Sequence, residues 1–393
     1  MSKRKAFVNF VKAENILFMI AVTILAMAVR LRFFGYVSSD YRQFLSGWFD
    51  LIRQNGGFAA MGINFGDYTP MYYYLLALVS YLPFRDLYLI KSLSCIGDIA
   101  AAYFVFRMVD RKYGEFWGEM AYSATLFLPS VVLNSSFWAQ CDSIYTAALL
   151  GCVFYLMEGR QYRAVTAFSI AFALKLQAVF LAPFLLLLLL KQKIKVRCLL
   201  IPPLVYMISI LPAAFLGRNF WDLITIYFRQ AQEYTQLTMN LPNLFSWIPA
   251  NAPESESVGK AAVLAAGALV LFTFAYLCSR QFPMTDEMIL SLSLFYTMML
   301  PYFLPFMHER YWYPADILAV AFAFYFPEKF YVPVITVLSS TYAYCRFLFG
   351  FRFISIKLFS VLMLFNLIWV AIHIIYLIQD GLDEKVMRPR WMS

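Results

Sequence analysis

Apolar segments recur from residue 15 almost to the end of the chain, separated by short polar loops. There are thirteen of them, and most approach the length of about 20 residues that an α-helix needs to cross a hydrocarbon layer about 30 Å thick. Hydrophobic residues make up 62% of the 393 residues and charged residues only 14%, which excludes an ordinary soluble domain. The sequence therefore predicts an all-α, polytopic membrane protein. The segments are 15–33, 69–83, 88–107, 117–133, 142–157, 163–175, 177–190, 199–216, 258–279, 286–304, 311–326, 330–346 and 354–378.

Basic residues between these segments predict how the chain is threaded through the membrane. Those within 3–5 and 385–390 place both termini in the cytoplasm by the positive-inside rule, and two ends on one side require an even number of crossings. The most basic loop, KQKIKVR at 191–197, is also expected to be cytoplasmic. Counting back from it, only 69–83 does not fit, so we expect this tyrosine-rich segment to lie at the outer interface. The prediction is about twelve transmembrane helices, with interfacial helices in a first outer loop at 33–87.

The predicted organisation has three parts. Residues 1–216 form a transmembrane module, 217–257 an outer loop with an amphipathic interfacial helix, and 258–393 a second transmembrane module. The first apolar segment is interpreted as an uncleaved helix rather than a signal peptide. The net charge of +9 lies in the loops, so membrane lipids, and not nucleic acid, are the expected partners. The basic N-terminal prefix and the lack of retention signals favour a bacterial plasma membrane.

Acidic residues beside apolar segments are candidates for chemistry, because a charge at membrane depth is costly unless it serves a cavity. Asp40 in SSDYRQF could be a general base or the N-cap of a following helix, and the sequence leaves the two evenly matched. Asp67 in FGDYTP has the same ambiguity, with capping the better interpretation. Asp142 could also be a cap, but Trp138 and Gln140 beside it form a polar and aromatic cluster typical of sugar sites.

Basic candidates occur at two other places. Lys175 and Gln177 lie between two apolar segments on the predicted outer side, where the positive-inside rule gives no reason for a lysine, so anion binding is favoured over a snorkelling anchor. His308, Glu309 and Arg310 follow directly on an apolar segment in PYFLPFMHERYW. Histidine and arginine can hold a phosphate by charge-assisted hydrogen bonds while glutamate orients them.

Motifs for nucleotides and metals are missing from the sequence. There is no GxxxxGK[ST], no GxGxxG after a strand and no DxD pair, and the six cysteines have no metal-ligand spacing. We therefore expect no cofactor and no divalent metal. An outward-facing site of this kind fits a donor that is already in the membrane, linked to a lipid phosphate.

An ordered set of segments resembles a known family. FWAQCDSIYT, AFALKLQAVFLAPFLLLLLL and PFMHERYWYPADIL, with GDYTPMYYYLLALVSYLP and LIKSLSCIGDIAAAYFVFR upstream, resemble the GT-C superfamily of polyprenyl-phosphate-sugar-dependent glycosyltransferases. In particular the chain looks like bacterial proteins similar to the glycosylphosphatidylinositol mannosyltransferases. The resemblance implies an inverting transfer of one sugar, mannose or another hexose, to a hydroxyl of a lipid-linked or cell-envelope glycan on the outer face.

The same resemblance assigns roles to residues. Asp40 would be the catalytic base, and His308 and Arg310, with Lys175 as a further candidate, would bind the donor phosphate. Ser38 and Ser39 precede Asp40 where the family often has a paired acid or a glycine, which leaves open whether Asp40 or Asp67 is the base. The residues implied to line the site are Asp67, Tyr68, Trp138, Gln140, Asp142, Gln177 and Glu309.

A transporter or flippase of a lipid-linked saccharide is the alternative function. Many membrane segments with polar residues between them suit that class as well. Such a protein is expected to contain two internally related halves, and the sequence has no such relation.

Overall fold

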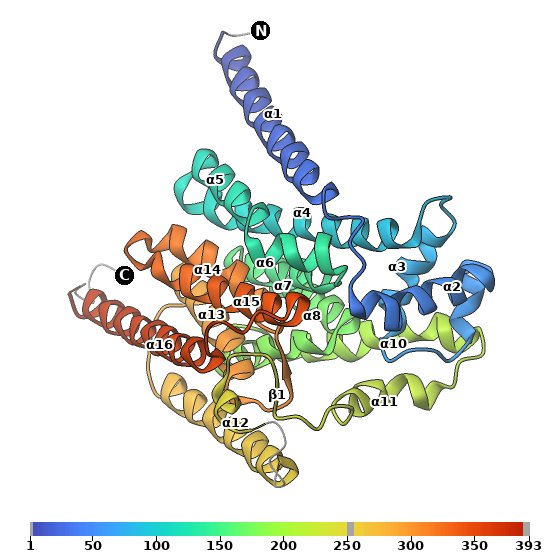
Figure 1. The fold of residues 1–393 in the computed structure, drawn as a ribbon. Helices are drawn as coiled ribbons and strands as arrows, with labels where there is room; N and C mark the ends of the chain where they lie inside the picture. The colour runs from blue at the N-terminus through green and yellow to red at the C-terminus, as the bar shows by residue number, and fades with distance from the viewer. Residues whose placement is uncertain (1–2, 250–254, 388–393) are drawn as a thin grey trace.

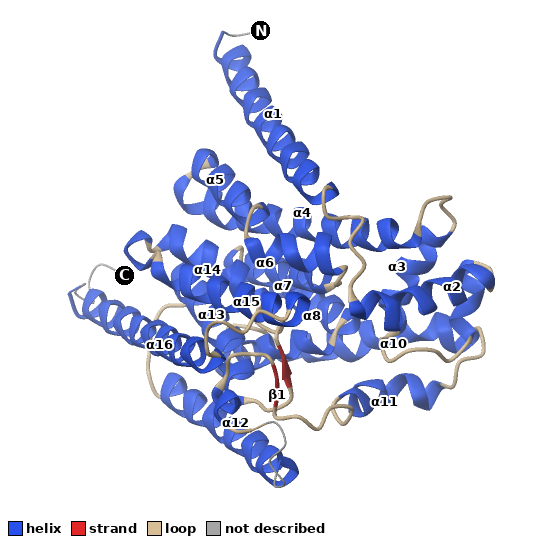
Figure 2. Ribbon diagram, viewed as in Figure 1, coloured by secondary structure: helices blue, strands red, loops and turns tan. Residues whose placement is uncertain are grey.

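The chain folds almost entirely into helices, as predicted (Figures 1 and 2). The structure, a computed structural model, describes residues 3–249 and 255–387, with side-chain surroundings for 14–249 and 255–380. The basic residues at 3–5 and 385–390, on which the predicted placement of the termini depends, lie outside the described side chains. The α-helices are α1 (Lys3–Leu31), α2 (Ser46–Gln54), α3 (Pro70–Ser80), α4 (Asp86–Tyr113), α5 (Glu115–Leu126), α6 (Pro129–Val132), α7 (Asp142–Met157), α8 (Gln161–Leu174), α9 (Ala182–Leu190), α10 (Ile201–Phe215), α11 (Phe220–Gln230), α12 (Ser255–Cys278), α13 (Asp286–Phe303), α14 (Tyr313–Tyr325), α15 (Tyr331–Phe349) and α16 (Ile356–Met387).

Shorter helical turns connect them. Two are π-helical, and both lie where candidate site residues occur. The turns are η1 (Tyr41–Leu45), η2 (Gly57–Gly62), η3 (Leu133–Trp138), η4 (Leu176–Leu181), η5 (Val196–Leu200), η6 (Leu244–Trp247) and η7 (Pro327–Lys329), of which η1 and η3 are the π-helices.

Six helices in the described part of the chain are long and apolar enough to cross a membrane, so the predicted count of about twelve is wrong. Several predicted crossings fold as helices that are too short. α7 has 16 residues, α8 has 14 and α14 has 13, and at about 1.5 Å per residue these fall short of a hydrocarbon layer about 30 Å thick. The segment at 69–83 is not among the six spans, as expected. The six spans are Glu14–Leu31, Asp86–Tyr113, Val196–Phe215, Ser255–Cys278, Pro327–Phe349 and Ile356–Asp380.

Large apolar side chains cover the outside of several of these spans. Phe215 on α10 is 83% exposed and Leu264 on α12 is 75% exposed. α1 extends away from the body of the molecule (Figure 1). Ile16, Leu17 and Ile24 on this helix are also exposed. Contiguous apolar surface of this extent needs a non-aqueous partner. Together with the six spans, it indicates an integral membrane protein.

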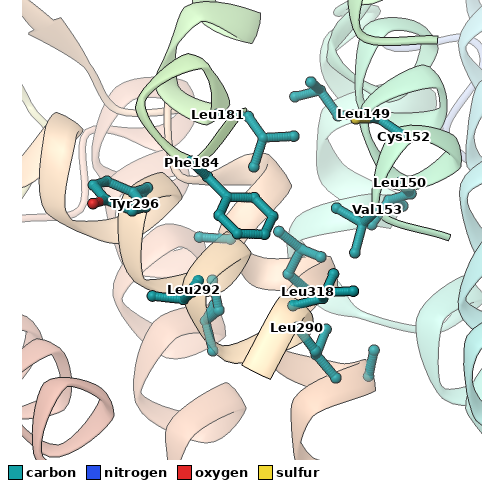
Figure 3. Packing of buried hydrophobic residues seen from close by; sticks show 14 of the residues in the cluster. Leu149, Leu150, Cys152, Val153, Leu181, Phe184, Leu290, Leu292, Tyr296 and Leu318 are labelled. Carbon is teal, nitrogen blue, oxygen red and sulfur yellow. The ribbon is translucent and has the colours of Figure 1, made fainter. Parts of the chain in front are cut away.

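A hydrophobic core joins the helices that carry the candidate site. Figure 3 shows Leu149 and Val153 of α7 beside Phe184 of α9, with Leu290 of α13 and Leu318 of α14 opposite. All five side chains are buried. Because α7 and α14 begin at one end of this core and α8 ends there, polar residues at those three termini come together.

Contacts at the other end of the core involve the basic loops. Lys112 at the end of α4 pairs with Glu287 at the start of α13, with 2.9 Å between Nζ and Oε1. Lys191, after α9, donates from Nζ to the carbonyl oxygen of Leu277 near the end of α12. The candidate site and these loops therefore lie at opposite ends of the helices.

A short parallel pairing connects the loop after α11 to the candidate site. Strand β1 (Thr238–Met239) lies beside β2 (Met307–His308), at the centre of the lower half of Figure 2. Phe306 has a φ of +65°, which turns the backbone into β2. The pairing fixes the segment that carries His308 against the loop after α11.

α11 is the amphipathic helix predicted in that loop. Leu223 and Ile226 on one side are buried, whereas Trp221 is 70% exposed and Phe228 is 72% exposed. Asn219 caps the helix, because its side-chain oxygen accepts hydrogen bonds from the N–H groups of the first turn. The helix is confirmed, and its place at the membrane interface stays a prediction.

Candidate functional site

One cavity of about 340 Å³ collects most of the candidate residues. Eight of the eleven side chains singled out in the sequence line it, although they come from five separate stretches of the chain. The eight are Asp40, Asp67, Tyr68, Gln140, Lys175, Gln177, His308 and Arg310. The other three, Trp138, Asp142 and Glu309, are almost fully buried behind the wall and contact residues that line it.

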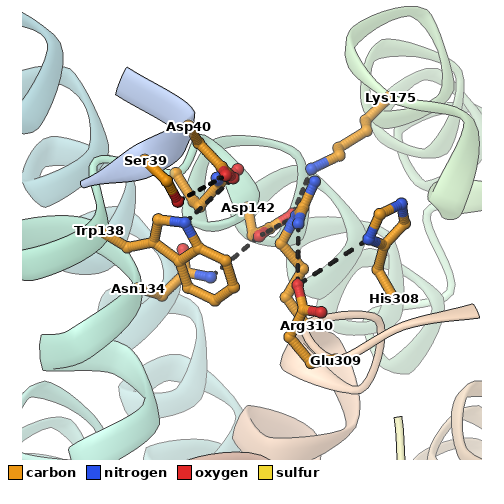
Figure 4. A network of polar contacts seen from close by, with 10 residues as sticks. Ser39, Asp40, Asn134, Trp138, Asp142, Lys175, His308, Glu309 and Arg310 are labelled. Carbon is orange, nitrogen blue, oxygen red and sulfur yellow. Dashed lines mark hydrogen bonds and ion pairs between the residues drawn. The ribbon is translucent and has the colours of Figure 1, made fainter. Parts of the chain in front are cut away.

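Asp40 faces the cavity through a carboxylate with one oxygen held and one nearly free. Its Oδ2 accepts hydrogen bonds from Trp138 Nε1 at 3.0 Å and Gln140 Nε2 at 2.6 Å (Figure 4). Ala139 lies between the two donors with a φ of +70°, a conformation that turns both side chains toward Asp40. Oδ1 has only a contact with Ser39 Oγ at 3.5 Å. The side chain caps no helix, so the capping interpretation is wrong for Asp40.

Asp142 is the centre of a buried group of charges. Its Oδ1 lies 2.5 Å from Lys175 Nζ, and its Oδ2 accepts from Asn134 Nδ2 at 2.9 Å and lies 3.6 Å from Arg310 Nε. The carboxylate is fully buried, and Lys175 is only 6% exposed. Asp142 makes no capping hydrogen bond, so this interpretation is wrong here too. The aspartate holds two cations at the wall of the cavity (Figure 4).

A break between two helices brings Lys175 to this position. α8 ends at Leu174, Lys175 has an extended backbone, and η4 begins at the next residue. The last carbonyl groups of a helix have no partners within the helix. Here Thr69 Oγ1 donates a hydrogen bond to the carbonyl oxygen of Ala173 at 2.6 Å. Thr69 belongs to the segment between α1 and α4, so the break also attaches that segment. Burial against Asp142 excludes the snorkelling interpretation of Lys175, and anion binding stays a prediction.

The sequence His308, Glu309, Arg310 folds so that each side chain has a different environment. Glu309 Oε1 lies 3.1 Å from Arg310 Nη1 and 3.9 Å from His308 Nδ1. Burial raises the pKa of Glu309 to about 7, although the Arg310 charge opposes this. Burial, Arg310 and Lys175 all lower the pKa of His308, so at pH 7 its imidazole is neutral. In the free protein, therefore, His308 offers an uncharged hydrogen bond beside the Arg310 side chain.

The raised pKa of Glu309 predicts a pH dependence of stability. A carboxyl group with a higher pKa in the folded than in the unfolded chain supports the fold fully below its unfolded pKa, near 4.5, and loses that contribution as pH rises through about 7. We expect Glu309→Gln to lose less stability than the wild-type protein between these values. Thermal unfolding in detergent from pH 4.5 to 8 measures the difference. Parallel curves for the two proteins would contradict the prediction.

Asp67 is paired with a residue that the sequence analysis did not select. Burial raises its pKa, and the pKa of Glu233, after α11, is raised by burial and by Asp67. The Gln230 side chain donates to the Asp67 carbonyl oxygen and joins α11 to the segment between α1 and α4. Thr69, not Asp67, precedes the first residue of α3, so the capping interpretation is wrong. The two carboxyl groups favour a shared proton over two full charges.

Other residues of the site were missed by sequence reasoning. Asn134 orients Asp142, and its signal is its place in the polar run NSSFWAQCD. Glu233 lies in the stretch that the sequence predicts as a loop with an amphipathic helix, where a single acidic residue does not indicate a site. Tyr234 stacks edge-on against His308, with ring centroids 4.6 Å apart. Trp48 lines the cavity from α2, and nothing in the sequence distinguishes it from the other aromatic residues of that segment.

Arg310 links the two sides of the site, because its guanidinium lies 5.5 Å from the ring centroid of Trp138, the residue that also holds Asp40. Among the described residues, no group of three or more histidines, cysteines, aspartates and glutamates is placed to hold a metal ion. The prediction of a metal-free site remains open. The chain matches no protein-family model and no curated protein, so its function is argued from this geometry.

Proposed function

We propose that the protein is an inverting glycosyltransferase that moves one sugar from a polyprenyl-phosphate donor to a hydroxyl of a lipid-linked or cell-envelope glycan. One observation carries the proposal. A carboxylate with a nearly free oxygen, Asp40, and two basic side chains that are paired with acids, Lys175 and Arg310, line the same cavity. This reaction needs a base that activates the attacking hydroxyl and positively charged groups that stabilise the departing phosphate.

The chemistry follows from these positions. Asp40 Oδ1 takes the proton of the acceptor hydroxyl while that oxygen forms a bond to the anomeric carbon of the donor sugar. The bond from that carbon to the phosphate oxygen breaks, and its electron pair leaves on the phosphate. Attack from the face opposite the phosphate inverts the configuration. Lys175 and Arg310 stabilise the negative charge that develops on the leaving group. Electrostatic stabilisation of this kind is often the largest contribution to catalysis.

The charge balance of the site suits a phosphodiester donor, which carries one negative charge. Asp142 and an ionised Glu309 neutralise Lys175 and Arg310. When Glu309 takes up a proton, which its pKa of about 7 allows near neutral pH, the group has one net positive charge. The single negative charge of a bound phosphate diester would then balance this positive charge, and His308 could donate a hydrogen bond to the phosphate.

Asp40 is a better base than Asp67 in this proposal. The two N–H donors on Oδ2 hold the Asp40 carboxylate in one orientation and leave Oδ1 for the acceptor. Asp67 faces another carboxyl group, Glu233, and burial raises its pKa, so it holds a proton more readily. We assign it to acceptor binding.

The proposed site faces away from the cytoplasm of a bacterial plasma membrane. The basic loops that carry Lys112 and Lys191 lie at the opposite end of the helices, and the positive-inside rule places such loops in the cytoplasm. The donor would then be used on the outer face, where no nucleotide sugar is needed.

The test is an assay of the purified protein in proteoliposomes with a panel of polyprenyl-phosphate sugars labelled in the sugar. We expect one donor to be consumed and its label to appear on a glycan or glycolipid acceptor, without added nucleotide. The control is a protein-free liposome with the same lipids. Movement of an intact labelled donor between leaflets, with no transfer, would identify a flippase and overturn the proposal.

A further inference from the structure

The segment between α1 and Asp40 has little regular structure of its own. α1 ends at Leu31, residues 32–35 form turns, and 36–38 have no regular structure. Carbonyl groups in such a segment need partners from elsewhere in the protein, particularly near a membrane boundary. Those partners determine where Asp40 lies.

Lys91 of α4 supplies three of these hydrogen bonds. Its Nζ donates to the carbonyl oxygens of Phe33, Phe34 and Tyr36 at 2.9, 3.1 and 2.8 Å, which uses all the donors of an ammonium group. The side chain is fully buried, and no carboxylate in the described part of the chain lies within 4 Å of it. Lys91 thus gathers the backbone that leads to Asp40 rather than pairing with an acid.

Asp98 lies two turns further along the same face of α4 and holds the end of α1. It is fully buried and accepts from Arg30 Nε at 3.0 Å, from Ser135 Oγ at 2.5 Å and from Tyr313 OH at 2.8 Å. Breaking a buried pair of this kind is strongly unfavourable, because one charge is left without a partner. One carboxylate therefore joins α1, η3 and α14 to α4.

Two of the three partners of Asp98, Ser135 and Tyr313, are close in sequence to residues of the proposed site. Ser135 is three residues before Trp138, which donates to the base, and Tyr313 is three residues after Arg310. Ser38 Oγ, two residues before the base, donates to the Trp138 carbonyl oxygen at 2.8 Å. The contacts of α4 thus reach both the base and the phosphate side.

We propose that Lys91 and Asp98, which we call the α4 clamp, are positioning residues that set the distance between Asp40 and the cations. The inference rests on the proposed function for its effect on rate. Neither residue lines the cavity, so neither contacts substrate. A bound donor and acceptor must be aligned to within about 1 Å, and an error of that size can lower a rate about 10²-fold.

The variants are Lys91→Met and Asp98→Asn, which remove a charge with little change of shape. Thr23→Val is the matched control, because the Thr23 hydroxyl also ties α1 to a neighbour, Tyr122 at 2.6 Å, but further from the site. The first readout needs no activity. The indole N–H resonance of Trp138 in nanodiscs, assigned by its loss in Trp138→Phe, reports the bond to Asp40.

We expect that resonance to shift in both clamp variants and to stay in place in Thr23→Val. We also expect kcat to fall by about 10²-fold in the clamp variants with the KM for donor little changed, and Lys91→Arg to recover part of the loss. An unchanged Trp138 resonance in folded Lys91→Met would overturn the proposal, even if Asp98→Asn did not fold. A shifted resonance in a protein whose wild type transfers no sugar would instead overturn the proposed function.

Discussion

Asp40→Asn is expected to lower sugar transfer by about 10³-fold while leaving donor binding nearly unchanged. An asparagine keeps the shape of the side chain, and its oxygen can still accept the bonds from Trp138 and Gln140 that hold Oδ2. What is lost is the basic oxygen that takes the acceptor proton. The phosphate side of the cavity is untouched, so the donor should bind as before. The measurements are single-turnover transfer from labelled donor and donor binding by scintillation proximity.

Two further substitutions separate this role from a structural one. Asp50 is an exposed aspartate of the segment between α1 and α4 and does not line the cavity, so Asp50→Asn should transfer at the wild-type rate. Asp67→Asn should raise the KM for acceptor with a smaller effect on kcat, because burial raises the pKa of Asp67 and makes it a poor candidate for the base. Equal loss of binding and turnover in Asp40→Asn would mark that residue as structural. If Asp67→Asn lowered sugar transfer as much as Asp40→Asn, the base could no longer be assigned to Asp40 alone.

Much of the helical fold could be predicted because apolar periodicity is a local property. The predicted segments correspond to helices, for example 286–304 to α13 and 354–378 to α16. The number of crossings could not be predicted, because a run of apolar residues does not reveal where a helix breaks. The extended backbone at Lys175 is stabilised by Thr69, more than a hundred residues earlier, and no local signal indicates that partner.

Site residues could be recognised in the sequence where a polar residue interrupts an apolar segment. They were missed where a polar residue lies in a stretch that is polar anyway. Lys175 and the run at 308–310 interrupt apolar segments, so they were selected, and the structure brings them together. Three aspartates were ambiguous because a helix cap and a site residue can both precede a helix, and only their hydrogen bonds distinguish the two. Glu233 was missed because it lies in a polar stretch where another acid carries no signal. Its importance arises only from its contact with Asp67.

Arg310→Lys is expected to lower kcat/KM for the donor by about 10²- to 10³-fold, the loss typical of removing one group that stabilises a developing anion. The positive charge is retained, but the planar guanidinium is not. It places Nη1 against Glu309 at 3.1 Å and Nε near Asp142, and lies over Trp138. A lysine cannot make these contacts at once, so the charge should leave the position where phosphate would bind. Steady-state transfer over a range of donor concentrations measures the loss.

Arg346→Lys is the matched control for this prediction, since it makes the same exchange at the same end of the helices. Arg346 Nε donates to Asn240 Oδ1 at 3.0 Å, and the residue does not line the cavity. We expect this variant to retain transfer, while Arg310→Lys remains folded but weakly active, with Asp142 still neutralised by Lys175. Equal losses in the two variants would mean that arginine supports the fold at both places. Wild-type kcat/KM in Arg310→Lys would remove Arg310 from the donor site and leave Lys175 as the cation that faces the leaving group.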